Sequence, residues 1–275
     1  MCVKSDAGVE IGPKVTSGRH PVRDEQDQAS IVASTIPPTD RHLLPEDVDG
    51  VVSSVQGWLG PREGRLLYRL AAEADPSGCI VEIGSWHGRS TIWLTAGAKA
   101  GRGARVFAID PHAGTHLRPE GETTERVLRA NLERAGTDDQ VEILVATSEE
   151  AAADWSRPIS LLWIDGDHEY GSVRRDLDLW EPHLLPDAAV ALHDTFVWPG
   201  PERVVHERLI KTGRFTSFLH AETTTAARRC ERLRPMGALA RRAGLVRRSL
   251  YGVRLRAYDA NSHGFARIRD ALVRR

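Results

Sequence analysis

The fold is indicated first by residues 79–91, which read CIVEIGSWHGRST. Residues 79–83 are a short apolar run typical of a buried strand, and the stretch from 90 to 100 has the pattern of a helix. Gly84 and Gly88 lie between the two, where the missing side chains let the backbone pass close to a ligand. The following helix offers unpaired N–H groups in its first turn. The stretch therefore predicts a strand, a ligand-binding loop and a helix in succession.

Strand and helix patterns alternate through the rest of the central region. Strands separated by helices indicate parallel units with right-handed crossovers, and the last two strands are close enough to form an antiparallel hairpin. We therefore predict an α/β fold, a doubly wound, Rossmann-like and mostly parallel sheet of about seven strands with helices on both faces. The predicted strands are 79–83, 105–109, 141–145, 159–164, 188–192, 215–219 and 223–227, and the predicted helices are 62–74, 90–100, 123–135, 149–155, 173–183 and 202–211.

The two ends of the 275-residue chain differ in charge. Residues 1–50 have a balance of −4, and residues 225–275 have a balance of +11, with fourteen arginines and no lysine, although the formal net charge of the whole chain is −1. The near-neutral total gives no argument for a nucleic-acid partner. We expect residues 1–45 to be a largely disordered arm and residues 46–229 to be the folded domain. Residues 230–275 are expected to be an Arg-rich helical extension that covers the acidic middle or touches an anionic surface.

Cysteine usage and hydropathy favour a reducing compartment. The three cysteines have unrelated spacings that match neither a disulfide framework nor a zinc site. No apolar run reaches the roughly 18–20 residues that a membrane span needs. The first residues also lack the apolar core of a secretory signal. We therefore expect a cytoplasmic protein.

The loop after the first strand differs from a dinucleotide-binding loop. Such a loop needs G-x-G-x-x-G, so that a pyrophosphate can lie on the helix N-terminus, and here Ser85-Trp86 replaces the second glycine. Glu82, at the end of the strand, would repel a pyrophosphate but suits a ligand that carries ammonium and sulfonium charges. The alternative is a tight turn in which Glu82 only caps neighbouring amides.

Two further strand ends carry polar residues at the edge of the sheet where ligands bind. Asp110 follows the second strand, where an acid about 20 residues beyond the loop accepts hydrogen bonds from a ribose diol. Ser148 follows the third strand, where a small polar residue can meet an adenine edge, although it could instead be the cap of the next helix. Together with the loop, these positions predict a cofactor site along the strand ends.

Three motifs make the comparison with a known family specific. The stretches VEIGSWHGRST at 81–91, FAID at 107–110 and IDGDHEY at 164–170 resemble the class I S-adenosylmethionine-dependent methyltransferases. More narrowly, they are similar to the methyltransferase-24 group and its relatives, the metal-dependent O-methyltransferases of macrolide and aminocoumarin sugars. The resemblance covers roughly residues 55–225. It implies transfer of a methyl group from S-adenosylmethionine to a hydroxyl of a sugar or other natural product. The cofactor contacts that it implies are Glu82, Gly84, Ser85, Gly88, Asp110 and Ser148.

The acceptor chemistry is expected at the ends of the fourth and fifth strands. Asp165, His193 and Asp194 would supply oxygen and nitrogen ligands for one divalent ion, Mg²⁺ or Mn²⁺. Such an ion would lower the pKa of a bound hydroxyl and orient its oxygen. Metal-dependent relatives have an acid after strand four and an acid pair after strand five, and His193 departs from that pair. Two mechanisms therefore stay open, methyl transfer assisted by a bound metal and metal-free methyl transfer.

Methyl transfer to a hydroxyl also needs a base that removes the proton. Asp167 matches the position of the base proposed for the sugar enzymes. His168 is the second candidate, because its free pKa lies near neutrality. The alternative is that Asp167 caps the next helix and that His168 only packs within its loop.

Two other classes of function share parts of this pattern. An NAD-type oxidoreductase has the same fold, but the missing G-x-G-x-x-G and Glu82 argue against it. A non-catalytic cofactor-binding partner protein is the other, and the acids at 165, 167 and 194 argue against that. We expect a small-molecule acceptor and no specific nucleic-acid partner, and a homo-oligomer is compatible with the sequence.

Overall fold

The computed structural model describes residues 43–113, 124–230, 246 and 249–253. Most of the predicted arm and most of the predicted Arg-rich extension lie outside these residues, so both stay predictions. Of the extension, residues 249–253 are helical, and the ring of Tyr251 lies 5.9 Å from that of His220. Among the described residues, none of the helices combines the length and the apolar character needed to cross a membrane.

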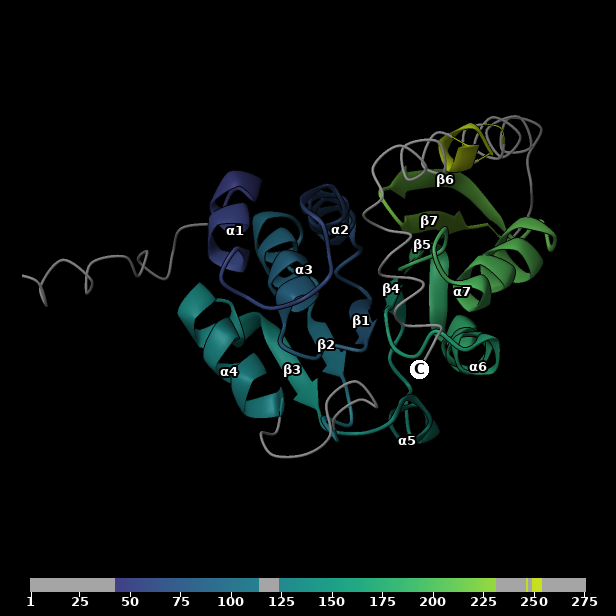
Figure 1. Cartoon of the computed structure of the whole chain (residues 1–275). Coiled ribbons are helices and arrows are strands. Elements are labelled where there is room, and N and C mark those ends of the chain that lie inside the picture. Colours follow the sequence, from purple (N-terminus) through teal and green to yellow (C-terminus); the bar gives the residue numbers. More distant parts are fainter. Residues whose placement is uncertain (1–42, 114–123, 231–245, 247–248, 254–275) are drawn as a thin grey trace, which may run out of the picture. The chain divides into compact units, whose positions relative to one another are not determined.

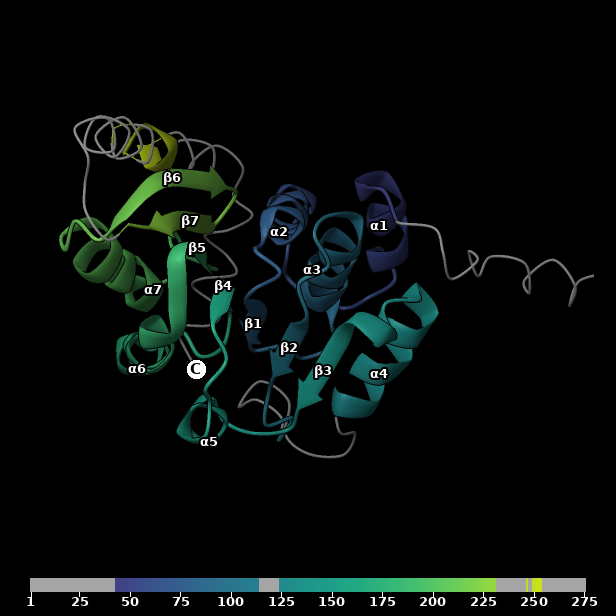
Figure 2. The ribbon, with the colours of Figure 1, turned by 180° about the vertical axis from the view of Figure 1, so that it is seen from behind.

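A seven-stranded sheet forms the centre of the domain, in the order β3-β2-β1-β4-β5-β7-β6 (Figure 1). Strands β1 to β5 pair in parallel, and β7 pairs antiparallel with both β5 and β6. Figure 2 shows β3 and β6 at opposite ends of the sheet. The predicted doubly wound fold is confirmed. The strand bounds are β1 Cys79–Ile83, β2 Val106–Ile109, β3 Val141–Leu144, β4 Ile159–Ile164, β5 Leu184–Leu192, β6 Phe215–Ala221 and β7 Thr224–Arg229.

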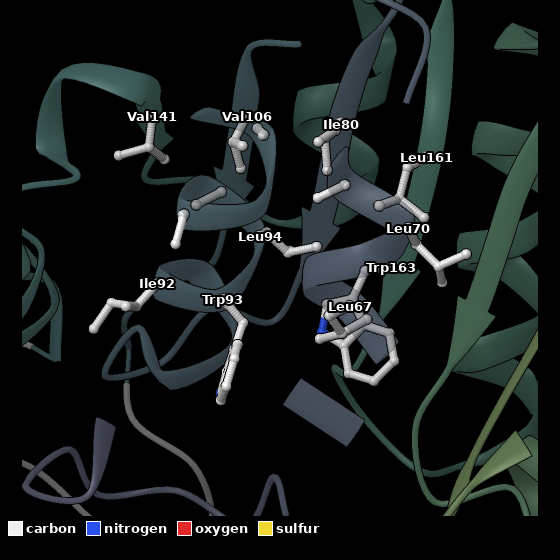
Figure 3. Packing of buried hydrophobic residues seen from close by; sticks show 14 of the residues in the cluster. Leu67, Leu70, Ile80, Ile92, Trp93, Leu94, Val106, Val141, Leu161 and Trp163 are labelled. Carbon is white, nitrogen blue, oxygen red and sulfur yellow. The ribbon is translucent and has the colours of Figure 1, made fainter. Parts of the chain in front are cut away.

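Helices cover both faces of the sheet. One apolar core joins Ile80, Val106 and Trp163 to the first four helices, and Figure 3 shows Leu67 and Trp93 packed there. The other core joins the opposite face of the sheet to the last three helices. Burial on both faces explains why β1 and β4 are mostly apolar along their whole length, with Glu82 and Ser160 as their polar residues, rather than alternating. The helix bounds are α1 Pro45–Val52, α2 Pro61–Glu73, α3 Arg89–Ala100, α4 Thr124–Ala135, α5 Ser148–Ala153, α6 Tyr170–Trp180 and α7 Pro199–Val204.

Several elements differ from the sequence predictions, including α6, which begins three residues earlier than predicted, at Tyr170. Helix α1 was not expected; it begins at a proline, and the Leu44 amide donates to the Asp47 carboxylate over 3.1 Å. Strand β5 begins at Leu184, four residues before the predicted start, because Leu184 already pairs with Ile159 across an irregular register. The helix predicted over 202–211 begins at Pro199 and widens into a π-helical turn over 205–210.

Candidate active site

The loop between β1 and α3 touches the end of β4. Gly84 has a φ of +87°, and a Cβ there would lie 2.3 Å from the carbonyl oxygen of Asp165. Gly88 has a φ of +85° and immediately precedes α3. The hydroxyl of Ser85 is buried and has no hydrogen-bond partner among the described residues. The loop is thus a close-packed backbone turn that contacts the end of β4 at Asp165. It also carries one unsatisfied polar atom, the Ser85 hydroxyl.

Glu82 has no exposed surface and lies under that loop. Its two carboxylate oxygens accept hydrogen bonds from the Ser90 and Thr91 hydroxyls over 2.5 and 2.6 Å. Burial raises the pKa of Glu82 to about 8, although those two hydroxyl bonds oppose the rise. The side chain therefore orders the first turn of α3, and a direct contact between Glu82 and a cofactor stays a prediction.

Asp110 follows β2 and holds the same loop from its other side. Its Oδ2 accepts from the Trp86 backbone N–H over 2.9 Å, and its Oδ1 accepts from the His112 N–H over 2.8 Å. A carboxylate has about four lone-pair positions, so two remain for further donors such as hydroxyls. Asp110 therefore lies beside the loop, and its contact with a ribose diol stays a prediction.

Ser148 is the first residue of α5 and contacts the end of α6. Its hydroxyl oxygen accepts from the Trp180 ring N–H over 2.9 Å. The N-cap of α5 is Thr147, whose side chain accepts from the Glu150 amide, so the alternative that Ser148 is the cap is wrong by one residue. Burial raises the pKa of Asp176 to about 6, and a hydrogen bond with Ser148 partly offsets this rise. The contact between Ser148 and an adenine edge stays a prediction.

The ends of β4 and β5 bring four of the predicted residues together. His193 Nδ1 lies 2.9 Å from Asp165 Oδ1 and 3.6 Å from Asp194 Oδ2. His168 Nε2 lies 3.0 Å from the same Asp194 oxygen. Ligand atoms of Asp165, His168 and His193 all lie within 4.8 Å of one another. The imidazoles of His168 and His193 therefore lie between the carboxylates of Asp165 and Asp194, at the carboxyl ends of β4 and β5.

A fifth member of this cluster, Glu63 of α2, was missed by the sequence analysis. It is 2% exposed, and its Oε2 lies 3.4 Å from His193 Nε2. Its Oε1 accepts from the amide and hydroxyl of Thr223 and from the hydroxyl of Thr224. The only local signal was the spacing of Gly60 and Glu63, a helix-capping pattern that says nothing of a partner far along the chain.

The carboxylates raise the pKa of both histidines. Burial alone would lower the pKa of His193, but Asp165 and Glu63 raise it well above its usual range. Asp194 does the same for His168, whose pKa is raised in spite of burial. Conversely, burial would raise the pKa of Asp194, yet the hydrogen bond from His168 holds it below its usual value. Each imidazole of the cluster therefore has a carboxylate partner that favours its protonated form.

Asp167 lies at the edge of this cluster and is exposed. Its oxygens accept from the Glu169 amide over 3.3 Å and from the Ser172 hydroxyl over 2.8 Å. Burial would raise the pKa of Asp167, but these bonds hold it below its usual value. Asp167 also lines a small pocket with Asp165 and His168. It thus has the contacts of a helix cap, and its predicted role as a base stays a prediction.

Comparison with known proteins identifies the central region. Residues 81–195 match a family described as a methyltransferase domain. The catechol O-methyltransferase of Mycobacterium tuberculosis is 34% identical over 109 residues, which cover 39% of this chain and 44% of that protein. The match therefore spans less than half the length of that curated relative. Residues 81–195 of this chain are therefore similar to a methyltransferase domain.

Solved structures with a similar fold include O-methyltransferases. An O-methyltransferase from Bacillus cereus in complex with SAH superposes with a TM-score of 0.51, at 19% identity, over 74% of this chain and 97% of that one. The O-methyltransferase TomG from Streptomyces achromogenes, in complex with SAM, has a TM-score of 0.50 at 15% identity, over 76% of this chain and all of that one. At these identities the likeness establishes the fold alone, and the resemblance predicted from the sequence is confirmed at that level.

Proposed function

We propose that this chain is an S-adenosylmethionine-dependent enzyme that methylates a hydroxyl oxygen of a small molecule. The observation that carries the proposal is the contact between Gly84 and the backbone of Asp165. Because of this contact, the loop suited to the cofactor adjoins the acid and histidine cluster suited to the acceptor. Transfer requires those two sites to be neighbours, since the reacting atoms must come within about 3–3.5 Å of each other.

The residues of the loop fit the cofactor. The unpartnered buried Ser85 hydroxyl needs a hydrogen-bonding group, which a polar group of the cofactor can supply. Asp110 retains acceptor positions for a ribose diol. Glu82 supports these groups from below through Ser90. When bound, the cofactor supplies an electrophilic methyl group on a sulfonium centre.

The proposed base is His168, with Asp194 as its orienting partner. A histidine held by a carboxylate on one ring nitrogen presents the other to a substrate proton. Since Nε2 is bonded to Asp194, Nδ1 is the nitrogen that would accept the hydroxyl proton as the oxygen gains its methyl group. Asp167 is the weaker candidate, because Ser172 and the Glu169 amide already occupy its oxygens.

Metal assistance, which the sequence left open, receives little support from the donor chemistry. Asp165, His168 and His193 are close enough to surround one ion. However, both ring nitrogens of His193 face carboxylates, whereas a histidine ligand must present a lone pair to the metal. The residues present do not fit Mg²⁺ or Mn²⁺, and the proposed reaction has no step at a metal.

The proposal is tested by calorimetric titration of the full-length chain with S-adenosylhomocysteine and, separately, with NAD. We expect binding of the homocysteine compound with a one-to-one stoichiometry and no heat from NAD. Asp110→Asn should weaken that binding. The substitution replaces one carboxylate oxygen, which can accept a hydrogen bond from a ribose hydroxyl, with an amide NH₂, which cannot. Tight NAD binding without a response to S-adenosylhomocysteine would instead support an oxidoreductase.

The acceptor is then sought among phenols and sugars. Catechols belong in the screen because the matched relative is a catechol O-methyltransferase, and sugars belong because the motifs resemble those of sugar enzymes. Mass spectrometry of the products identifies which hydroxyl gains a methyl group. The quaternary state, the contact of the Arg-rich extension with anionic surfaces and the cytoplasmic setting stay predictions.

A further inference from the structure

His193 lies where three carboxylates from distant parts of the chain converge. Asp165 and Asp194 come from the ends of β4 and β5, and Glu63 comes from α2 on one face of the sheet. The ring is 5% exposed. Its Nδ1 lies 2.9 Å from Asp165, and its Nε2 lies 3.4 Å from Glu63. Both nitrogens of one buried ring are therefore directed at acids.

A metal ion at this position would need a different arrangement of the same atoms. Metal-bound imidazole is neutral and offers one nitrogen lone pair to the ion, while its other nitrogen donates to a carboxylate or carbonyl. In this cluster Nδ1 of His193 and Nε2 of His168 are already within hydrogen-bond distance of Asp165 and Asp194. An ion placed among these donors would have to displace both contacts.

The position of Glu63 makes such a rearrangement costly. One of its oxygens accepts three hydrogen bonds from Thr223 and Thr224, and the other accepts the Gly60 amide over 2.8 Å. The carboxylate is therefore held in place, and it is buried. A buried charge that loses its partner costs several kcal/mol, so Glu63 holds the His193 ring between the acids.

We propose that the His193 ring takes the place of a divalent ion among Asp165, Asp194 and Glu63, and that methyl transfer by this chain needs no metal. The inference rests on the proposed methyl-transfer function. His193 acts as a positioning residue, because its ring lies between Asp165 and Glu63 and beside Asp194, and fixes the orientation in which Asp194 holds His168. The acids that metal-dependent relatives use as ligands serve here as hydrogen-bond partners of imidazole.

Mn²⁺ binding tests the proposal without an acceptor. Full-length protein, stripped with a chelator, is titrated with Mn²⁺ and free ion is followed by electron paramagnetic resonance. We expect no stoichiometric binding by the unsubstituted chain up to the millimolar range. The double variant Glu63→Gln/His193→Asp removes the buried imidazole and the acid that holds it, and supplies an acid pair after β5. It should bind Mn²⁺ at least about tenfold more tightly.

The control is His206→Asp, which makes the same change at an exposed position of the turn over 205–210. It should bind Mn²⁺ no better than the unsubstituted chain. One tightly bound Mn²⁺ per unsubstituted chain would overturn the proposal, as would methylation of an identified acceptor that stops on chelation and resumes with metal. If the double variant does not fold, by circular dichroism, the titration of the unsubstituted chain still decides. Failure to bind S-adenosylhomocysteine would overturn the proposed function, whereas the Mn²⁺ titration alone decides whether His193 takes the place of an ion.

Discussion

At Gly84 the chain passes so close to the end of β4 that a single methyl group has no room. The φ of +87° already disfavours any side chain, and the added carbon would lie 2.3 Å from a backbone oxygen of Asp165, which cannot turn aside as a side chain could. Two residues earlier, Glu82 is buried beneath the loop, and its oxygens accept from hydroxyls of α3. The conformation of the loop thus depends on the missing side chain of Gly84 and on the hydrogen bonds of Glu82.

Gly84→Ala should lower the free energy of unfolding by about 2–4 kcal/mol, because backbone strain and overpacking add. Gly103→Ala is the matched control: its φ is +78°, but nothing lies within 4 Å of the added carbon. That variant should lose only the strain part, about 1–2 kcal/mol. Urea unfolding measures both. Equal losses in the two variants would show that the contact with Asp165 carries no energetic weight.

Glu82→Gln should flatten the dependence of stability on pH. The folded pKa of about 8 lies above the ordinary value of 4.5, so between these two values the unfolded chain releases a proton that the folded chain keeps. Glu82 therefore destabilises the fold progressively as pH rises through that window, by up to about 1.4 kcal/mol per pH unit, and has no such effect below it. Unfolding at several pH values within the window measures the slope. Glu142→Gln, at an exposed glutamate of β3, should keep the original slope, and an unchanged slope in Glu82→Gln would contradict the prediction.

Among the secondary-structure elements, α3 organises the segment that precedes the sheet. Arg89, its first residue, donates to the carbonyl oxygens of Val52, Val55 and Leu59 over 2.7 to 3.0 Å. These carbonyls belong to the end of α1 and to the connection toward α2, which otherwise has few backbone partners. The same segment carries Trp58, whose exposed ring stacks on Trp86 of the β1 loop at 5.0 Å. One arginine therefore couples the β1 loop to the helices before it.

Arg89→Met keeps the length of the side chain but removes all three donors. We expect a loss of about 2–4 kcal/mol in the free energy of unfolding, because three partly buried carbonyls lose a side-chain donor, although that of Val52 still accepts from the Val55 amide. Binding of S-adenosylhomocysteine should also weaken as the segment around Trp58 loosens. Arg129→Met, which removes only a surface ion pair with Glu125 one turn away, should cost less than about 1 kcal/mol. Similar losses in both variants would contradict this account of Arg89.

At the scale of the whole molecule, the buried carboxylate of Glu63 joins three distant segments. It contacts the end of β5 through His193, 130 residues away, and the turn between β6 and β7 through Thr223, 160 residues away. The antiparallel hairpin thereby closes against α2 at the strand ends where the acceptor is proposed to bind. Because the contact exists only when helix, strand and turn have all assembled, it reports on the completed fold.

Glu63→Ala should destabilise the chain by about 3–5 kcal/mol, since it leaves His193 and the Thr223 amide buried without their partner. Glu73→Ala is the control on the same helix: this exposed glutamate pairs with Arg228 of β7, and its loss should cost no more than about 1 kcal/mol. Chemical denaturation of the two variants distinguishes them. A loss near 1 kcal/mol for both would mean that the buried cluster adds nothing to stability.

The sequence by itself determined the sheet, the order of its elements and the places where functional side chains stand. Apolar runs such as 79–83 and 159–164, buried on both faces, are legible from composition alone. Once the strands are parallel, Asp110, Asp165 and Asp194 must lie along one edge. The boundaries were less exact, as at Leu184 and Pro199, because register and helix type depend on neighbours that a local pattern does not contain.

Only the tertiary structure decided what those side chains do to one another. His193 stood out in the sequence as a departure from an acid pair, but nothing near it announced Glu63, the acid that holds it. Ser148 and Asp167 stand at the predicted strand ends, yet their oxygens are occupied by Trp180 and by Ser172. The physical reason is range: strand and helix patterns arise from neighbours a few residues apart, whereas protonation and hydrogen-bond pairing at a buried cluster are set by groups that meet only when the chain has folded.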